Sequence, residues 1–219
     1  MPVGRAVEAP RAAGVAGLVF AVLFVASVVL LHRQPGAGST AEEVRAWYLG
    51  ENASRVGVVG LYLAPFAGIA FLWFMAVMRH HVSALEDRFF DTVLTGSGIV
   101  FIAMLFATAA SAGSLVAAVK FRDAPIPGPE AVGVARSLAY TFFYVYALRA
   151  AAVFMVVAST IGRRSGGLPR WLALAGYALA LVLLLSVSYA PLMALLFPAW
   201  VTAVSVVILV RSLGKGRSS

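Results

Sequence analysis

The sequence contains no cysteine among its 219 residues. Disulfide bonds, thiol redox chemistry and cysteine-ligated metal sites are therefore excluded. Charge is also scarce, because Asp, Glu, Lys and Arg make up 12% of the residues, against about 25% in soluble domains. Hydrophobic residues make up 62%, which is more than a soluble fold can keep away from water. The composition therefore predicts an integral membrane protein.

Acidic side chains are missing from the apolar stretches of the chain. All nine carboxylates lie in loops or at the ends of these stretches, and no Asn, Gln, Lys or His lies inside one. Proton-coupled carriers keep an ionisable group within the membrane, and a serine nucleophile needs a neighbouring base. We therefore favour a non-enzymatic function without a cofactor.

Metal binding is not expected either. Two adjacent histidines are followed by three acids, in the order His80, His81, Glu86, Asp87 and Asp91. Neighbouring residues on a helix point about 100° apart, so the two histidines do not face one ion easily. The spacing also matches no standard metal-binding motif. We interpret this group as part of an interfacial loop.

Six apolar stretches have about the 20 residues needed to cross a hydrocarbon core of about 30 Å. Lipid offers the backbone no hydrogen-bond partners, so each stretch is predicted to be a helix. The predicted fold is an all-α membrane protein with a single domain over residues 1–219. Its six transmembrane helices are expected at about 12–31, 56–78, 92–119, 134–160, 171–188 and 192–210.

The basic residues indicate the orientation of the chain. With the N-terminus inside, ten Lys and Arg residues fall in cytoplasmic segments and six in outer segments. This excess predicts that both the N-terminus and the C-terminus are cytoplasmic. The basic residues behind the net charge of +8 stand singly at the ends of apolar stretches. Such a distribution is typical of membrane anchoring, and no nucleic-acid partner is expected.

A short amphipathic helix is predicted in the longest outer loop, at about residues 40–50. A hydroxyl residue followed three positions later by an acid is a capping-box signature, here Ser39 or Thr40 with Glu42 or Glu43. Three residues then share one face of the helix: Val44, Trp47 and Tyr48. We expect this helix on the outer surface, either as a lid packed against the helix ends or as a gate for a ligand.

The stretch at 92–119 carries small residues that lie within about 40° of one line along a helix. They are Gly96, Ala103, Ala107, Ala110, Ser114 and Ala118. A ridge of small residues lets a neighbouring backbone approach closely, which holds helices together in lipid. The sequence therefore predicts that this helix is the central packing element and that the ridge is its contact face. A polar pathway lined by the hydroxyl residues of this helix is the alternative.

Arg149 lies near the middle of the stretch at 134–160. An arginine at such a depth costs about 2.5–3.5 kcal/mol, and the apolar stretches hold no acid to pair with it. Its five N–H donors must therefore go to carbonyls, to hydroxyls or to a bound ligand. Tyr146 lies on the same face of the helix, whereas Tyr140 and Tyr144 lie almost opposite.

Three interpretations of Arg149 stay open at this point. The guanidinium holds carbonyls or tyrosines of neighbouring helices, or it binds an anionic ligand or lipid head group, or it extends along the helix to the membrane surface. The candidate ligand-binding residues are Arg149, Tyr146, Tyr140, Tyr144 and Trp47.

Three segments carry a resemblance to a known family. They are "GIAFLWFMAVMRHHVSALEDRFF", "VYALRAAAVFMVVASTIGRRSGGLPRWLALAGYALALVLLL" and "FPAWV", and the step "LPRWLALAGY" at 168–177 is the most recognisable. Together they resemble multi-pass membrane proteins of high-GC bacteria that are grouped as a domain of unknown function. The resemblance implies a bacterial cytoplasmic membrane, and it transfers no functional residue to this chain.

Two hypotheses for the function follow from these observations. In the first, the protein binds a hydrophobic or anionic amphiphile near Arg149, such as a lipid, and in one version moves it. In the second, the protein is an accessory or scaffold subunit whose small-residue surfaces pack against a membrane protein partner. A membrane enzyme is the third alternative.

Overall fold

The computed structural model describes residues 5–31, 33–36, 38–51, 53, 55, 62–83, 88–186 and 190–215. Within these ranges the regular structure is helical throughout and contains no strand, which confirms the all-α prediction. The elements are α1 (Arg5–Leu31), α2 (Ala41–Leu49), α4 (Ala64–Ser83), α5 (Arg88–Phe121), α6 (Pro129–Tyr140), η2 (Thr141–Ala147), α7 (Leu148–Arg164), α8 (Arg170–Leu185) and α9 (Pro191–Lys215).

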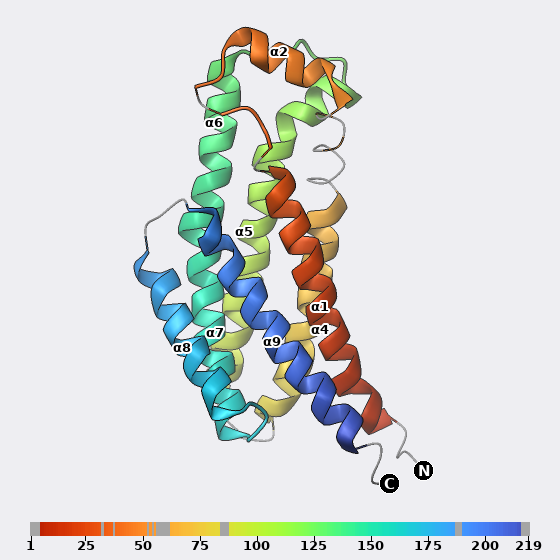
Figure 1. The fold of residues 1–219 in the computed structure, drawn as a ribbon, viewed down its shortest axis with the longest axis vertical. Helices are drawn as coiled ribbons and strands as arrows, with labels where there is room; N and C mark the ends of the chain where they lie inside the picture. Colours follow the sequence, from red (N-terminus) through yellow and green to blue (C-terminus); the bar gives the residue numbers. More distant parts are fainter. Residues whose placement is uncertain are drawn as a thin grey trace.

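The long helices lie side by side along the long axis of the molecule (Figure 1). The elements α6, η2 and α7 form one helix, Pro129–Arg164, which runs antiparallel to α5. The beginning of α1 and the end of α9 lie together at one end of the molecule, and α2 lies across the other end. The α8–α9 hairpin covers only the half nearer the termini, so that the α5–α6 ends rise beyond it toward α2.

Four of the described helices are long and apolar enough to cross a membrane. They are Arg11–Leu30, Arg88–Phe121, Pro129–Arg164 and Pro191–Leu213. The apolar parts of α4 and α8 are shorter, Ala64–Ala76 and Arg170–Leu185. The predicted spans at 56–78 and 171–188 include residues 56–61 and 187–188, which lie outside the described residues. The chain is therefore built to be embedded in a membrane, and its six crossings stay a prediction.

The centre of the bundle is a cluster of phenylalanine rings. Its members are at most 5% exposed and come from α1, α4, α5, η2, α7 and α9: Phe20, Phe24, Phe71, Phe74, Phe101, Phe143, Phe154 and Phe197. The ring centroids of Phe20 and Phe71 are 4.9 Å apart, and those of Phe101 and Phe197 are also 4.9 Å apart. Tilted and edge-to-face rings at such distances attract each other beyond their burial, so the cluster ties six elements together.

Helix α5 is central, as predicted, because it packs against α4, α6, η2 and α7. The predicted contact face is wrong, however. Gly96, Ala103, Ala110 and Ser114 on the small-residue ridge are exposed. The buried face of α5 carries larger side chains such as Phe101 and Leu105. These fill the space around the phenylalanine cluster, and the ridge is left on the outside of the bundle.

A tight junction holds α7, α8 and α9 together at Gly176. Ser159 of α7 and Trp200 of α9 are 0% and 2% exposed, and both approach Gly176 of α8. A Cβ at residue 176 would lie 2.1 Å from Ser159 Oγ and 2.7 Å from Trp200 Nε1. Because Gly176 has no side chain, these two polar side chains fit beside it. Trp200 therefore has a packing role.

We predict that Gly176→Ala lowers the free energy of unfolding by about 1–3 kcal/mol, because overfilling a packed junction forces the neighbours apart. The measurement is thermal unfolding in mild detergent. Gly113→Ala is the matched control, since it lies on a buried face of α5 and no heavy atom lies within 4 Å of its Cβ position. Equal unfolding temperatures for the two variants would contradict the junction.

Candidate functional site

Arg149 is the second residue of α7 and is partly buried. Its Nη1 donates hydrogen bonds to Tyr144 O and, at 3.1 Å, to Val145 O. Its Nη2 donates to Ser186 O at 3.1 Å. The guanidinium is thus bonded to three neutral backbone oxygens. These bonds occupy three of the five N–H donors of an arginine, and they reach both its own helix and the end of α8.

The π-helical segment η2 explains why a carbonyl is open to Arg149. At the end of η2, Leu148 N–H bonds to Phe143 O, five residues back. In a regular α-helix the same N–H would bond to Tyr144 O, four residues back. Arg149 donates to Tyr144 O instead. The side chain therefore takes over the carbonyl that the wide turn removes from the backbone ladder, and an unpaired carbonyl in lipid would cost several kcal/mol.

The third acceptor lies at the C-terminal end of α8. Ser186 is the C-cap residue of this helix, and the last four carbonyls of a helix lack partners within it. A cation at this end also interacts favourably with the helix dipole. Arg149 thus holds the C-terminal end of α8 against α7, and this end lies below the α2 end of the bundle (Figure 1).

A groove of about 650 Å³ lies between α5 and the η2–α7 helix, beside Arg149. Its lining is apolar except at three residues, and consists of Val93, Gly96, Ser97, Val100, Met104, Val145, Tyr146, Arg149, Ala150 and Val153. Ser97 Oγ donates back to Val93 O at 2.6 Å. Tyr146 is 51% exposed. Arg149 and Tyr146 therefore line the same groove, as their shared helix face suggested.

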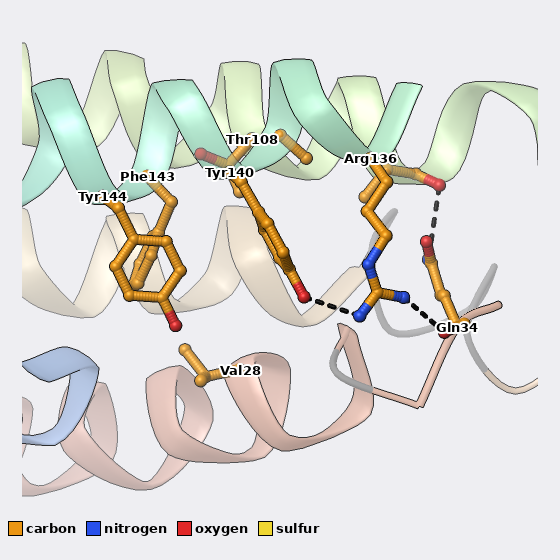
Figure 2. Close-up of a pocket in the computed structure, with 9 residues that line it drawn as sticks. Val28, Gln34, Thr108, Arg136, Tyr140, Phe143 and Tyr144 are labelled. Carbon is orange, nitrogen blue, oxygen red and sulfur yellow. Dashed lines mark hydrogen bonds between the residues drawn. The ribbon is translucent and has the colours of Figure 1, made fainter. Parts of the chain in front are cut away.

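Tyr140 and Tyr144 line a different cavity, which Figure 2 shows between α1, α5 and the α6–η2 helix. This cavity measures about 30 Å³, enough for one or two water molecules. The rings of the two tyrosines meet edge to face at 5.7 Å. The four tyrosine and arginine candidates of this helix therefore form two separate sites on opposite sides.

Arg136 is the residue of this cavity that sequence analysis missed. Its Nη1 donates to Gln34 O and, at 2.9 Å, to Pro35 O, and its Nη2 donates to Tyr140 Oη at 2.6 Å. Gln34 Nε2 donates in turn to Ala112 O of α5 at 3.3 Å. Arg136 thus fastens the segment after α1 to α6 (Figure 2). The spacing of four residues between Arg136 and Tyr140 was the available signal.

Trp47 belongs to neither site. It lies on α2, which begins with the predicted capping box: Thr40 Oγ1 accepts from Glu43 N–H, and the Glu43 side chain accepts from Thr40 N–H. The helix packs on the ends of α5 and α6 through a second apolar cluster, consisting of Val44, Tyr48, Ala53, Val116 and Val132 with Trp47 partly buried beside it. We call α2 and this cluster the cap.

Metal ligands are not gathered in the described part of the chain, where no group of three His, Asp or Glu side chains is placed to hold an ion. The side chains of His80 and His81, and residues Glu86 and Asp87, lie outside the described residues.

By length and composition, the four long apolar helices are those of a helical membrane protein. Comparison with protein-family models, with curated proteins and with solved structures finds no match. The function is therefore argued from the geometry of the two sites.

We predict an alkaline transition of the cap. Burial raises the pKa of Tyr48 from 10.0 to about 12, so the folded state favours the neutral phenol. The stabilisation is complete below about pH 10 and is lost as the pH rises toward about 12, because the unfolded chain then releases the proton first. The measurement is the unfolding temperature as a function of pH for wild type and Tyr48→Phe, which cannot ionise.

The Tyr48→Phe variant should lose less stability than wild type in this range. Tyr62→Phe is the control, because Tyr62 is 58% exposed and should follow wild type. The same alkaline loss in all three proteins would contradict the role of Tyr48.

Proposed function

We propose that the protein binds an anionic amphiphile from the bilayer, with the head group at Arg149 and Tyr146 and an apolar chain in the α5–α7 groove. The observation that carries this proposal is the position of the partly buried residue Arg149 in the lining of an otherwise apolar groove. The anionic head group would then contact Arg149, and the apolar chain would contact the apolar side chains of the groove.

The charge of Arg149 supports an anionic ligand. The two ion pairs of the described residues, Arg55–Glu51 and Arg79–Asp91, lie elsewhere. The three carbonyls give the guanidinium hydrogen bonds without neutralising it. A phosphate or carboxylate would supply the countercharge and accept hydrogen bonds from the two remaining N–H groups. Hydrogen bonds between charged groups are about twice as strong as neutral ones.

The dimensions of the groove support a lipid chain. Along α5 the lining runs from Val93 to Met104, which is about 16 Å at 1.5 Å per residue. Half of the hydrocarbon core measures about 15 Å. Gly96 leaves the wall of the groove open, since no heavy atom lies within 4 Å of its Cβ position. The groove is therefore about as long as one leaflet of the hydrocarbon core is thick.

The proposed setting is the cytoplasmic membrane of a bacterium, with six crossings, both termini inside and the cap outside. The beginning of α1 and the end of α9 lie together (Figure 1), as an even number of crossings requires. Basic residues also gather at helix ends on that side: Arg79, Arg88, Arg163, Arg164, Arg170 and Arg211. Their number favours the cytoplasmic side for this end.

A second function is favoured by the outward ridge of α5. Small side chains of α5 and α6 line a shallow groove of about 600 Å³ nearer the cap, among them Ala110, Ser111, Ser114, Ala131 and Ala135. Small residues on an outer face allow a transmembrane helix of another protein to approach closely. Co-purification of a stoichiometric partner in mild detergent is the test of this accessory role.

We predict that the purified protein retains anionic lipid and that Arg149→Gln lowers this retention about tenfold, equivalent to about 1.4 kcal/mol. Native mass spectrometry after exchange into mixed phosphatidylglycerol and phosphatidylcholine measures the bound lipid. Arg149→Lys should keep a preference for phosphatidylglycerol, because the charge is retained, but with lower affinity, because the planar fork of donors is lost.

The chain site is tested by Gly96→Leu, which fills the groove and should reduce retention of both lipids. Ala178→Leu is the matched control, because Ala178 is an exposed small residue of α8 away from the groove. Equal lipid retention by wild type, Arg149→Gln and Gly96→Leu would refute lipid binding in this groove.

The absence of native cysteine permits a direct test of the orientation. We predict that Arg45→Cys, on the exposed face of α2, reacts with a membrane-impermeant maleimide in intact cells. Ser165→Cys, in the exposed α7–α8 turn, should react only after lysis. The reverse pattern would place the cap in the cytoplasm.

A further inference from the structure

Arg149 lies deep in the apolar part of its helix. The nearest charged residues along the chain are Arg136, 13 residues earlier, and Arg163, 14 residues later. At about 1.5 Å per residue, each lies about 20 Å away along the helix axis. A hydrocarbon core of about 30 Å placed anywhere between these two charges buries Arg149 by at least about 10 Å. A ligand of Arg149 must therefore bring its anionic group to this depth.

Arg149 also lies near one end of its groove. A Cβ at Gly98 of α5 would lie 3.5 Å from Phe154 Cδ2 of α7. The two helices are antiparallel (Figure 1), so residues after Gly98 on α5 lie beside residues before Phe154 on α7. Arg149 therefore lies near the Met104 end of the lining. Its hydrogen bond to Val145 O places Nη1 still further in that direction.

The groove is apolar from Arg149 to its other end, which lies at Val93 near the start of α5. Ser97 is the polar residue of this part of the lining, and its hydroxyl donates to Val93 O at 2.6 Å. The polar and apolar parts of the groove are thus arranged end to end. The polar part lies deep in the membrane, and the apolar part runs from there toward the surface at Arg88.

This arrangement does not match a phospholipid of either leaflet. In the leaflet at the Arg88 side, a phospholipid keeps its head group at the surface and its chains in the middle, which is the reverse order. A phospholipid of the opposite leaflet has the right direction. Its phosphate would have to sink by about 10 Å to reach Arg149, and a charge at such a depth is costly.

We propose that the ligand of the Arg149 groove is a long-chain fatty acid, bound with its carboxylate at Arg149 and its chain toward Val93. This inference rests on the proposed function and narrows its ligand. A carboxyl group enters the apolar layer as the neutral acid, because desolvation favours the uncharged form. Beside the guanidinium the opposite charge favours the carboxylate, and the proton passes to the aqueous phase. A phosphodiester has no such neutral form near neutral pH.

The donors left at Arg149 match a carboxylate. Three of the five N–H groups bond to backbone oxygens, which leaves Nε–H and one Nη2–H. The same two nitrogens of Arg79 hold the carboxylate of Asp91, with Nε 2.7 Å from Oδ1 and Nη2 2.8 Å from Oδ2. Paired bonds of this kind are among the strongest that an arginine makes. The fatty acid takes at Arg149 the place that Asp91 takes at Arg79.

The experiment places the full chain in phosphatidylcholine nanodiscs with palmitate, dipalmitoylphosphatidylglycerol or hexadecanol at one mole fraction. Native mass spectrometry measures the share of protein that carries each. We expect palmitate to bind about tenfold more tightly than the other two. The phosphate of the phospholipid does not reach Arg149, and hexadecanol has no charge. Arg149→Gln should remove the preference for palmitate over hexadecanol.

A second variant keeps the test decisive if Arg149→Gln fails to fold, which its unfolding temperature would show. Gly96→Leu fills the apolar part of the groove without changing the arginine, and should lower palmitate binding about tenfold. Ala178→Leu, at an exposed position of α8, is the matched control and should bind as wild type. Equal palmitate binding by Gly96→Leu and Ala178→Leu overturns the inference.

The direction of the chain is tested with palmitate that carries a photoreactive diazirine at its methyl end. The cross-links, mapped by peptide sequencing, should lie around Val93 and Val153. Cross-links around Met104 and Val145 instead would show the reverse direction and overturn the inference.

The outcomes also separate this inference from the proposed function. Phosphatidylglycerol bound through Arg149 at least as tightly as palmitate overturns the fatty acid and leaves an anionic amphiphile in the groove. Binding of all three amphiphiles that ignores both Arg149→Gln and Gly96→Leu overturns both.

Discussion

Hydrocarbon supplies no hydrogen-bond donor, so a backbone carbonyl that leaves the helical ladder must find one within the protein. The wide turn η2 creates this need at Tyr144 O, and the end of α8 creates it again at Ser186 O. One guanidinium meets both needs. Arg149 thereby permits two irregular features at membrane depth: a π-helical segment in the longest continuous helix and a hairpin that ends below the cap.

Arg136 and Arg149 make their hydrogen bonds outside an apolar centre of the bundle. The phenylalanine cluster fills the space between α1, α4, α5, η2, α7 and α9 with apolar side chains. Arg136 fastens α6 to the segment after α1, and Arg149 fastens the end of α8 to α7. The small-residue ridge on the outer face of α5 borders two shallow grooves, at Gly96 and at Ala110 and Ser114. The bulky buried face of α5 and its exposed small-residue ridge thus result from the same packing of this helix.

Much of the fold could be predicted because it depends on local composition. Apolar length located the helices, and the capping box located α2 at Thr40 and Glu43. The lack of an acid near Arg149 left carbonyls, hydroxyls or a ligand as its partners, and the structure shows three carbonyls. Other features depend on distant contacts. The partners of Arg136 lie about 100 residues earlier in the chain, and the face that α5 buries was decided by the phenylalanine cluster. The spacing of the small residues alone could not show which face of α5 is buried.

The cap has a consequence for how the chain is made. Val44 leaves the ribosome well before Val132, against which the cap cluster is completed. At about 5–20 residues per second, synthesis of the intervening chain takes several seconds. During this interval the amphipathic segment has no docking surface, and the membrane interface is the environment that suits its apolar face. α2 must then move from the membrane interface onto the ends of α5 and α6. Assembly of this end of the molecule is therefore a late step in biogenesis.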